Sequence, residues 1–287
     1  MSLRTLTTGT ELRAVVRAAQ HAGHTVGLVP TMGALHEGHL SLIDAARREC
    51  DLVVATVFVN PTQFGPNDDL GKYPRDVSRD LALLAERRCD IVFTPAVEEM
   101  YPPGFGTTID VGVVAGPLDG EFRPGHFRGV ATVVMKLFQL APADRAYFGQ
   151  KDYQQSLVVR QLVRDLNVPI EIRVCPTVRE PDGLALSSRN AYLSAGDRRR
   201  AVALSESLRL AEKLHRAGER DPQAIETAMR QHLAAAGGVE VQYIALLRDG
   251  TVEPVTRIDG PTVVAIAAIV GGTRLIDNVR LELSDER

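Results

Sequence analysis

The sequence predicts an α/β protein with a doubly wound, Rossmann-like and mainly parallel sheet, followed by a smaller C-terminal α+β domain. Short apolar runs alternate with amphipathic stretches over the first two-thirds of the chain, which is typical of strands joined by crossover helices. Runs such as DLVVATVFV are continuously apolar, which indicates strands covered on both faces. After about Val178 the order changes to two helices and then three strands.

Residues 1–178 form the predicted parallel domain. Predicted strands are 24–29, 51–59, 91–94, 145–148 and 170–178, and predicted helices are 11–22, 39–50, 76–88, 130–140 and 153–166. The strands are short and rich in Val, Ile and Leu, whereas the helices carry apolar residues at helical spacing. Because parallel strands need crossover connections, we expect helices on both faces of the sheet.

The remaining residues, 179–287, form the predicted α+β domain. A polar loop over 179–190 leads to helices at 197–217 and 222–236, then to strands at 240–247, 262–269 and 274–283. Ser194, with Asp197 three residues later, is typical of a helix start. Gly271 and Gly272 lie between the last two strands and indicate a hairpin turn.

Composition narrows the class of partner. The 287 residues are 45% hydrophobic and 24% charged, with a net charge of −3, which argues against nucleic acid or an anionic membrane as the main partner. Cys50, Cys89 and Cys175 lack metal-ligand spacing and are expected to be buried thiols. We find no signal-peptide core and no run long enough to span a bilayer, so we expect a cytoplasmic protein.

The segment PTMGALHEGH, which follows the first predicted strand, is the main candidate site. A strand, a glycine-bearing loop and a helix N-terminus in succession favour phosphate binding through main-chain N–H groups and the helix dipole. His36 and His39 lie three residues apart and face one side if the helix begins near Gly38. The alternative is that the two histidines only cap the helix. The segment has neither the P-loop nor the GxGxxG pattern.

Polar side chains also follow two other predicted strands. Gln63, in VNPTQFG, offers an amide that can hold a hydroxyl or a carboxylate, whereas Asn60 and Tyr73 are open between a binding role and an ordinary loop. In FGQKDYQQ, Lys151 suits phosphate and Asp152 suits magnesium, with Gln155 one turn further on. Asp80 is a weaker candidate for magnesium.

Two further segments carry candidate residues. Ser187, Ser188 and Arg189, in GLALSSRN, offer two hydroxyls and a guanidinium for phosphate oxygens, and the alternative is a solvated turn with a capping serine. The segment FRPGHFRGV contains Arg123, His126 and Arg128. These three side chains suit a carboxylate or phosphate, or simply solvate the entry to a helix.

PTMGALHEGH, FVNPTQFGPNDDLGKYPR, FGQKDYQQ and PTVREPDGLALSSRN occur in this order, and the chain thereby resembles the pantothenate synthetases, or pantoate–β-alanine ligases. The HxGH element alone indicates only the wider nucleotidylyltransferase superfamily, and the KDYQQ and SSRN elements narrow it. The resemblance covers most of the chain and is densest over residues 27–190. One departure is Leu186, where the family usually has Met, a change that nearly conserves volume.

The resemblance implies a two-step reaction. ATP and pantoate form pantoyl-adenylate and pyrophosphate with Mg²⁺, after which β-alanine displaces AMP to give pantothenate. It also implies a homodimer, an ATP- and pantoate-binding domain over 1–178 and a C-terminal lid over 179–287.

The resemblance also assigns roles to individual residues. Implied catalytic residues are His36, His39, Lys151 and Arg189. Implied ATP contacts are Pro30, Met32, His36, His39, Gly149, Lys151, Asp152, Val178, Leu186, Ser187, Ser188 and Arg189. Implied pantoate contacts are Thr31, Met32, Gln63 and Gln155, with Gln63 also near β-alanine. The expectation that Asp152 holds Mg²⁺ comes from its carboxylate beside a phosphate site.

Two other functions compete with the ligase interpretation. Another nucleotidylyltransferase on the same fold would stop at a nucleotide product, without a β-alanine-dependent step. A nucleotide-binding regulator that has lost catalysis would lack a histidine or lysine of these motifs, yet His36, His39 and Lys151 are all present. In the ligase mechanism, cationic and N–H groups offset charge that moves onto pyrophosphate, and no protein nucleophile is needed.

Overall fold

The computed structural model describes residues 3–66 and 68–282. The chain divides into two compact units. The first consists of Met1–Gln150 and Gln154–Pro176, and the second of Lys151–Tyr153 and Thr177–Arg287. Lys151–Tyr153, which the sequence analysis placed in the first domain, therefore makes its contacts with the second unit.

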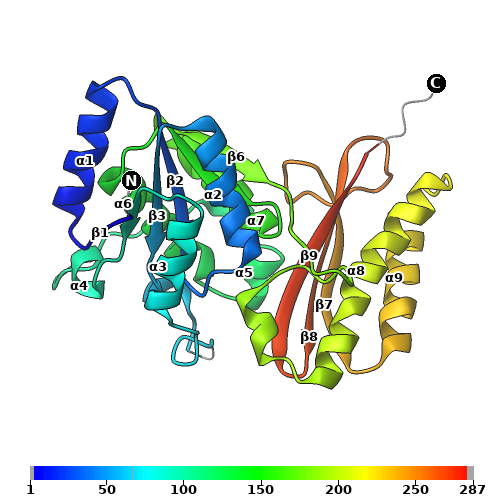
Figure 1. Cartoon of the computed structure of the whole chain (residues 1–287). Helices are drawn as coiled ribbons and strands as arrows, with labels where there is room; N and C mark the ends of the chain where they lie inside the picture. The colour runs from blue at the N-terminus through cyan, green and yellow to red at the C-terminus, as the bar shows by residue number, and fades with distance from the viewer. Residues whose placement is uncertain (1–2, 67, 283–287) are drawn as a thin grey trace. The chain divides into compact units, whose positions relative to one another are not determined.

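A six-stranded sheet forms the centre of the first unit, in the order β1-β4-β3-β2-β5-β6, and all its pairings are parallel (Figure 1). The strands are β1 (Arg4–Leu6), β2 (Val26–Thr31), β3 (Leu52–Val57), β4 (Ile91–Phe93), β5 (Arg145–Gly149) and β6 (Glu171–Cys175). The predicted α/β, parallel architecture is thus confirmed. β1 was not predicted, because three residues are too few to show a pattern.

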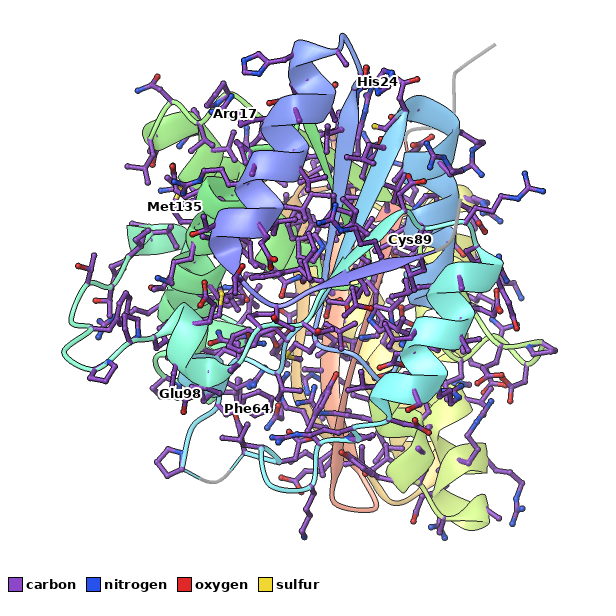
Figure 2. The ribbon with its side chains drawn as sticks, turned by 60° about the vertical axis from the view of Figure 1, so that its left-hand side comes forward. Arg17, His24, Phe64, Cys89, Glu98 and Met135 are labelled. Atoms are coloured by element: carbon purple, nitrogen blue, oxygen red, sulfur yellow. The ribbon has the colours of Figure 1, made fainter. Side chains whose placement is uncertain are left out.

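Helices cover both faces of this sheet. α1 (Gly9–His21) and α6 (His126–Leu140) lie on one face, whereas α2 (Glu37–Glu49) and α3 (Val77–Glu86) lie on the other (Figures 1 and 2). Beneath α2 and α3, buried Ile43, Ala46 and Leu84 pack against Val53 and Val92 of the strands. The other helical segments are η1 (Pro61–Gln63), α4 (Val97–Met100), η2 (Gly112–Ala115), α5 (Asp119–Phe122) and α7 (Tyr153–Asp165).

The strand order reverses direction between β2 and β5. The chain runs outward from β2 through β3 to β4, then returns to start β5 on the other side of β2. In open parallel sheets, ligands bind beyond the carboxyl ends of the strands at such a switch point. The segment PTMGALHEGH follows β2, and FGQKDYQQ includes the end of β5.

β2 contains a proline although it is a central strand. β2 pairs with β5 only at Gly27 and Leu28, while its pairing with β3 continues to Thr31. The main-chain N–H and C=O of Thr31 both point towards β3. The N–H donates to Thr56 Oγ1 at 3.2 Å, and the carbonyl accepts from Phe58 N–H. Because successive residues alternate sides, the nitrogen of Pro30 faces β5. A proline is tolerated there because no ladder bond is required.

The second unit has a three-stranded antiparallel sheet, β7 (Val239–Arg248), β8 (Thr262–Val270) and β9 (Thr273–Leu281). α8 (Ala195–Arg216) and α9 (Pro222–Ala236) pack on this sheet. Their buried Leu204, Leu208 and Met229 meet Ile244 and Ile266 of the strands. Gly271 and Gly272 form the hairpin with φ of 55° and 75°, as predicted.

Most predicted bounds are off by one or two residues, and two are off by more for identifiable reasons. The strand expected at 170–178 ends at Cys175, because Pro176 has no N–H to continue the ladder. The helix expected at 130–140 begins at His126 after Gly125, whose φ is 82°; its polar first turn hid the start. Leu283, the expected end of the last strand, lies outside the described residues. Among the helices in the described part of the chain, we find none with the length and apolarity needed to cross a membrane.

Candidate active site

The loop after β2 has an unusual main-chain path that Asp80 supports. Gly33 and Ala34 adopt positive φ of 82° and 52°. Asp80 of α3 accepts the N–H of Ala34 at 2.9 Å and that of Leu35 at 2.8 Å. A Cβ on Gly33 would lie 2.9 Å from Asp80 Oδ2, so the close approach requires glycine. Burial raises the pKa of the Asp80 carboxyl, and the two N–H bonds act against that by favouring the anion.

Asp80 therefore holds the main chain of the loop between β2 and α2. Both of its oxygens accept main-chain N–H groups, and the residue is 1% exposed. The weak magnesium role considered for it stays a prediction, and the contacts that the structure shows for both oxygens are with the loop. The path that Asp80 supports leads directly to His36.

His36 and His39 lie together at the start of α2. His36 is the N-cap, and its Nδ1 accepts the N–H of Gly38 at 3.1 Å. The two imidazole centroids are 4.1 Å apart and tilted by 34°. Because an N–H can only donate, Nδ1 of His36 must carry the lone pair, and the proton of the neutral ring lies on Nε2. Capping and a donor role at Nε2 are thus compatible.

Thr31 and Met32 connect this loop to β3 and to Gln63. The Thr31 hydroxyl donates to Thr56 O at 2.5 Å and accepts from Gly33 N at 3.2 Å. The pantoate contact expected of Thr31 stays a prediction, and its hydroxyl already donates to β3. Met32 Sδ lies 3.1 Å from Gln63 Nε2, so two of the predicted pantoate contacts are neighbours.

The direction of the Gln63 amide follows from a chain of hydrogen bonds. Asn60 Oδ1 accepts the main-chain N–H of Thr62 at 3.3 Å, and Asn60 Nδ2 donates to the carbonyl of Gly129 at 3.2 Å. A main-chain N–H only donates and a carbonyl only accepts, so the Asn60 amide has one possible orientation. Its Nδ2 then donates to Gln63 Oε1 at 3.0 Å.

The side-chain NH2 group of Gln63 consequently points towards Met32 Sδ. The amide is an N–H donor at this position, which suits an acceptor such as a carboxylate or hydroxyl oxygen. Tyr101 adds a 2.7 Å bond to Asn60 Oδ1. Burial raises the pKa of the Tyr101 phenol, so it remains a donor. Asn60, left open by the sequence, is 1% exposed and orients Gln63 from behind.

The main chain of Gln63 is held by the FRPGHFRGV segment. His126 Nδ1 lies 2.9 Å from Gln63 O, and Arg123 Nη1 lies 3.1 Å from His126 Nε2. Arg123 also pairs with Asp68 at 2.9 Å. Arg128 instead forms an exposed pair with Asp110 at 3.1 Å. The sequence did not distinguish these three basic residues. In the structure, Arg123 and His126 contact the Gln63 loop, whereas Arg128 pairs with Asp110.

The residues after β5 are divided between the two units. Gly149 ends β5 and Gln155 lies half-buried in the first turn of α7, both in the first unit. Lys151 and Asp152 belong to the second unit, where Asn278 Nδ2 donates to Lys151 O at 3.0 Å. Lys151 Nζ lies 3.7 Å from Asp152 Oδ1.

In the second unit, a tight turn precedes the predicted phosphate residues. Arg179 and Ala185 form an antiparallel bridge, and Leu186 N donates to Val178 O at 3.0 Å. Arg179 pairs with buried Asp277 of β9 through bonds of 2.6 and 2.9 Å. Asp277 and Asn278 are adjacent, so the same point of β9 holds this turn and the main chain of Lys151.

Ser187, Ser188 and Arg189 follow that turn. Ser187 caps the 3₁₀ helix η3 (Ser188–Tyr192), and its Oγ accepts from Arg189 N at 3.3 Å. The capping role considered as the alternative is therefore real, and the Ser187 O–H still has a proton to donate. Two polar atoms at this turn, Thr177 Oγ1 and Asn190 Oδ1, are buried without a hydrogen-bond partner in the described chain, which is rare without water or a ligand.

The donor set for magnesium is sparse. We find no group of three or more His, Cys, Asp or Glu side chains arranged for a metal among residues 3–66 and 68–282. Asp152 is half-exposed, with a side-chain accessibility of 45%. A single accessible carboxylate fits an Mg²⁺ that keeps waters and is carried chiefly by nucleotide phosphates.

Four residues support the site from elements distant in sequence: Asp80, Tyr101, Arg179 and Asp277. The sequence indicated Asp80 only as a weak magnesium candidate and did not predict that it holds the loop. Tyr101, Arg179 and Asp277 were not predicted, because no local pattern marks them.

Comparison with known proteins gives a consistent result. A model of the family described as pantoate-beta-alanine ligase matches residues 4–280. A pantothenate synthetase of Roseiflexus castenholzii is 54% identical over 280 residues, which cover 98% of this chain and 100% of the relative. One from Thermotoga neapolitana is 52% identical over 279 residues, with 97% and 100% covered.

Solved structures agree with the sequence relatives. The crystal structure of pantothenate synthetase from Thermus thermophilus has a TM-score of 0.93 and 47% identity, with 98% of this chain and 100% of that chain covered. Pantoate-beta-alanine ligase from Francisella tularensis, complexed with beta-gamma ATP and beta-alanine, has a TM-score of 0.81 and 35% identity, with 97% of both chains covered. This chain belongs to the pantoate–beta-alanine ligase family.

Proposed function

We propose that this protein condenses pantoate with β-alanine at the expense of ATP, through a pantoyl-adenylate, and releases AMP and pyrophosphate. The observation that carries the proposal is the adjacency of β3, β2 and β5, whose carboxyl ends lead to Gln63, to His36 and His39, and to Gln155. The relative from Francisella tularensis was crystallised with beta-gamma ATP and beta-alanine, which supports the same substrates here.

The first step joins two anions, so charge and position decide its rate. Gln63 offers N–H donors that hold pantoate while its carboxylate attacks the α-phosphorus. His36 directs Nε2–H, and the start of α2 directs main-chain N–H groups, at the triphosphate. These groups stabilise charge that develops on pyrophosphate. We assign His39, Pro30, Met32 and Gly149 to the same nucleotide site.

The second unit is proposed to supply further phosphate ligands. Lys151, Ser188 and Arg189 are suited to phosphate oxygens, Val178 and Leu186 to the nucleotide, and Asp152 to Mg²⁺. When bound, Mg²⁺ would neutralise phosphate charge. The lid role of the second unit, the homodimer and the cytoplasmic location stay proposals that rest on the family resemblance.

The test separates a ligase from its rivals. The protein is incubated with ATP, Mg²⁺ and pantoate, and pyrophosphate, AMP and pantothenate are measured before and after β-alanine is added. We expect pyrophosphate with pantoate alone, and AMP with pantothenate only after β-alanine. A nucleotide product without a β-alanine-dependent step would identify a nucleotidylyltransferase, and ATP binding without turnover would identify a regulator.

A further inference from the structure

His126 is a half-buried histidine in the segment that the proposed reaction leaves without a role. It is the first residue of α6, and its ring nitrogens contact two different partners. Nδ1 lies 2.9 Å from the carbonyl oxygen of Gln63. Nε2 lies 3.1 Å from Nη1 of Arg123. A substrate is not required to explain either contact.

These two partners determine where the ring proton is. A carbonyl oxygen can only accept a hydrogen bond, so Nδ1 must carry hydrogen. A guanidinium can only donate, so Nε2 must carry the lone pair. His126 is therefore the neutral Nδ1–H tautomer. Protonation of Nε2 would set an N–H against the N–H of Arg123 and break that contact.

The surroundings of His126 also oppose its positive charge. Burial and the neighbouring Arg123 guanidinium lower the pKa of His126 to about 4. The carboxylates of Asp68 and Asp119 and the hydrogen bond to Gln63 act in the other direction, but with smaller effect. At neutral pH the imidazole is thus an N–H donor of fixed direction and a poor proton shuttle.

We infer that His126 is a positioning residue for the acid substrate, because it fixes the main chain of Gln63. Asn60 Nδ2 holds the Gln63 side chain at 3.0 Å, and His126 holds its carbonyl. Arg123, itself tied to Asp68, orients the imidazole. Gln63 is consequently held both at its side-chain amide and at its main-chain carbonyl. The inference rests on the proposed contact between Gln63 and pantoate.

Three substitutions separate a positioned N–H from the imidazole ring itself. In His126→Asn, the amide NH2 replaces the Nδ1–H donor at nearly the same distance from the main chain. His126→Gln extends beyond that position, and His126→Ala has no donor. Arg128→Ala is the matched control, because Arg128 lies in the same segment and its side chain forms an exposed pair with Asp110.

The readout is pantoate-dependent exchange of pyrophosphate into ATP without β-alanine. We expect pantoate KM to rise about 10-fold in His126→Ala and His126→Gln, and to stay within about 3-fold of wild type in His126→Asn. ATP KM should change less than about 2-fold in all variants, since a folded nucleotide site is retained. Arg128→Ala should match wild type.

Contrary results are equally specific. Unchanged pantoate KM in His126→Ala and His126→Gln, or a defect in His126→Asn as large as in His126→Ala, overturns the inference. So does an effect confined to the KM of β-alanine, which would make His126 a contact for the amine substrate. In a Gln63→Ala background, His126→Ala should add no further rise in pantoate KM, because the two changes act on one contact.

Failure of the proposed function is recognised separately. Wild-type protein without pantoate-dependent exchange, or Gln63→Ala with normal pantoate KM, would refute the assigned reaction or the assigned contact. The hydrogen bond is then decided by ¹⁵N NMR of the His126 ring. The Nδ1–H tautomer supports a donor to Gln63, whereas the Nε2–H tautomer or an imidazolium at neutral pH excludes it.

Discussion

The Asn60 amide illustrates how main-chain groups can set the polarity of a binding side chain. Thr62 N–H and Gly129 C=O admit one orientation of Asn60, and Asn60 admits one orientation of Gln63. The sequence predicted Gln63 as a ligand from its place after a strand. It left Asn60 open, because the decisive partner, Gly129, lies 69 residues further along the chain.

Asn60→Asp should reverse that polarity. The new carboxylate would face Gln63 Oε1 and Gly129 O, so the Gln63 amide turns and directs its oxygen at the substrate. We expect pantoate KM to rise about 10- to 100-fold, because acceptors then oppose acceptors at a buried position. Tyr101→Phe is the control: it removes one donor but leaves both orienting groups, and should cost less than about 5-fold. Equal effects of the two changes would contradict the orientation argument.

At the scale of elements, α3 contributes most through one side chain. Asp80 holds the loop between β2 and α2 in a conformation with positive φ at two consecutive residues. The element pattern of the first unit was predictable, because strands and helices have local periodicities. The support of a loop by a helix 45 residues away was not, because no local pattern encodes it.

Asp80→Asn tests the support of this loop. The new NH2 group would face the N–H of Ala34 or Leu35 and leave it unsatisfied, which should lower the free energy of unfolding by about 1–3 kcal/mol. Asp76→Asn, at the N-cap of the same helix, should change it by only a few tenths, since Asn caps as well as Asp. Urea unfolding measures both variants. If Asp80→Asn and Asp76→Asn lowered the free energy of unfolding equally, the contact between Asp80 and the loop would not stabilise the protein more than an ordinary helix cap does.

At the scale of the molecule, the order of the elements was accessible from sequence, but the grouping of residues into compact units was not fully so. Lys151–Tyr153 lies where the chain passes from β5 into the first residue of α7, yet these residues make hydrogen bonds with β9 and with the turn at Gly250 and Thr251. Side-chain contacts from more than 95 residues away make that assignment, and no feature of KDY itself predicts it. The motifs identify candidate groups and leave their supports unspecified.

Global stability should depend on pH through His126. The unfolded chain protonates this histidine below about pH 6.5, whereas the folded protein keeps it neutral to about pH 4. Lowering the pH between these values therefore favours the unfolded state. By about pH 4.5 the loss should be at most about 2–3 kcal/mol, and His126→Asn should lack it. Urea unfolding of the wild type and of His126→Asn at about pH 6.5 and about pH 4.5 measures this difference. If both proteins lost the same free energy of unfolding between the two pH values, His126 would be protonated in the folded protein as readily as in the unfolded chain.

Pro30 gives the sheet a fixed property at its switch point. Its nitrogen faces β5, whose pairing with β2 stops at Leu28. Because that nitrogen carries no hydrogen, no change in pH, ligand or side-chain packing can supply the donor that further pairing would need. Pairing of β2 with β5 towards the loops that bear His36 and Gln155 would therefore always lack this hydrogen bond. The separation of these two strand ends does not have to be created when substrate arrives.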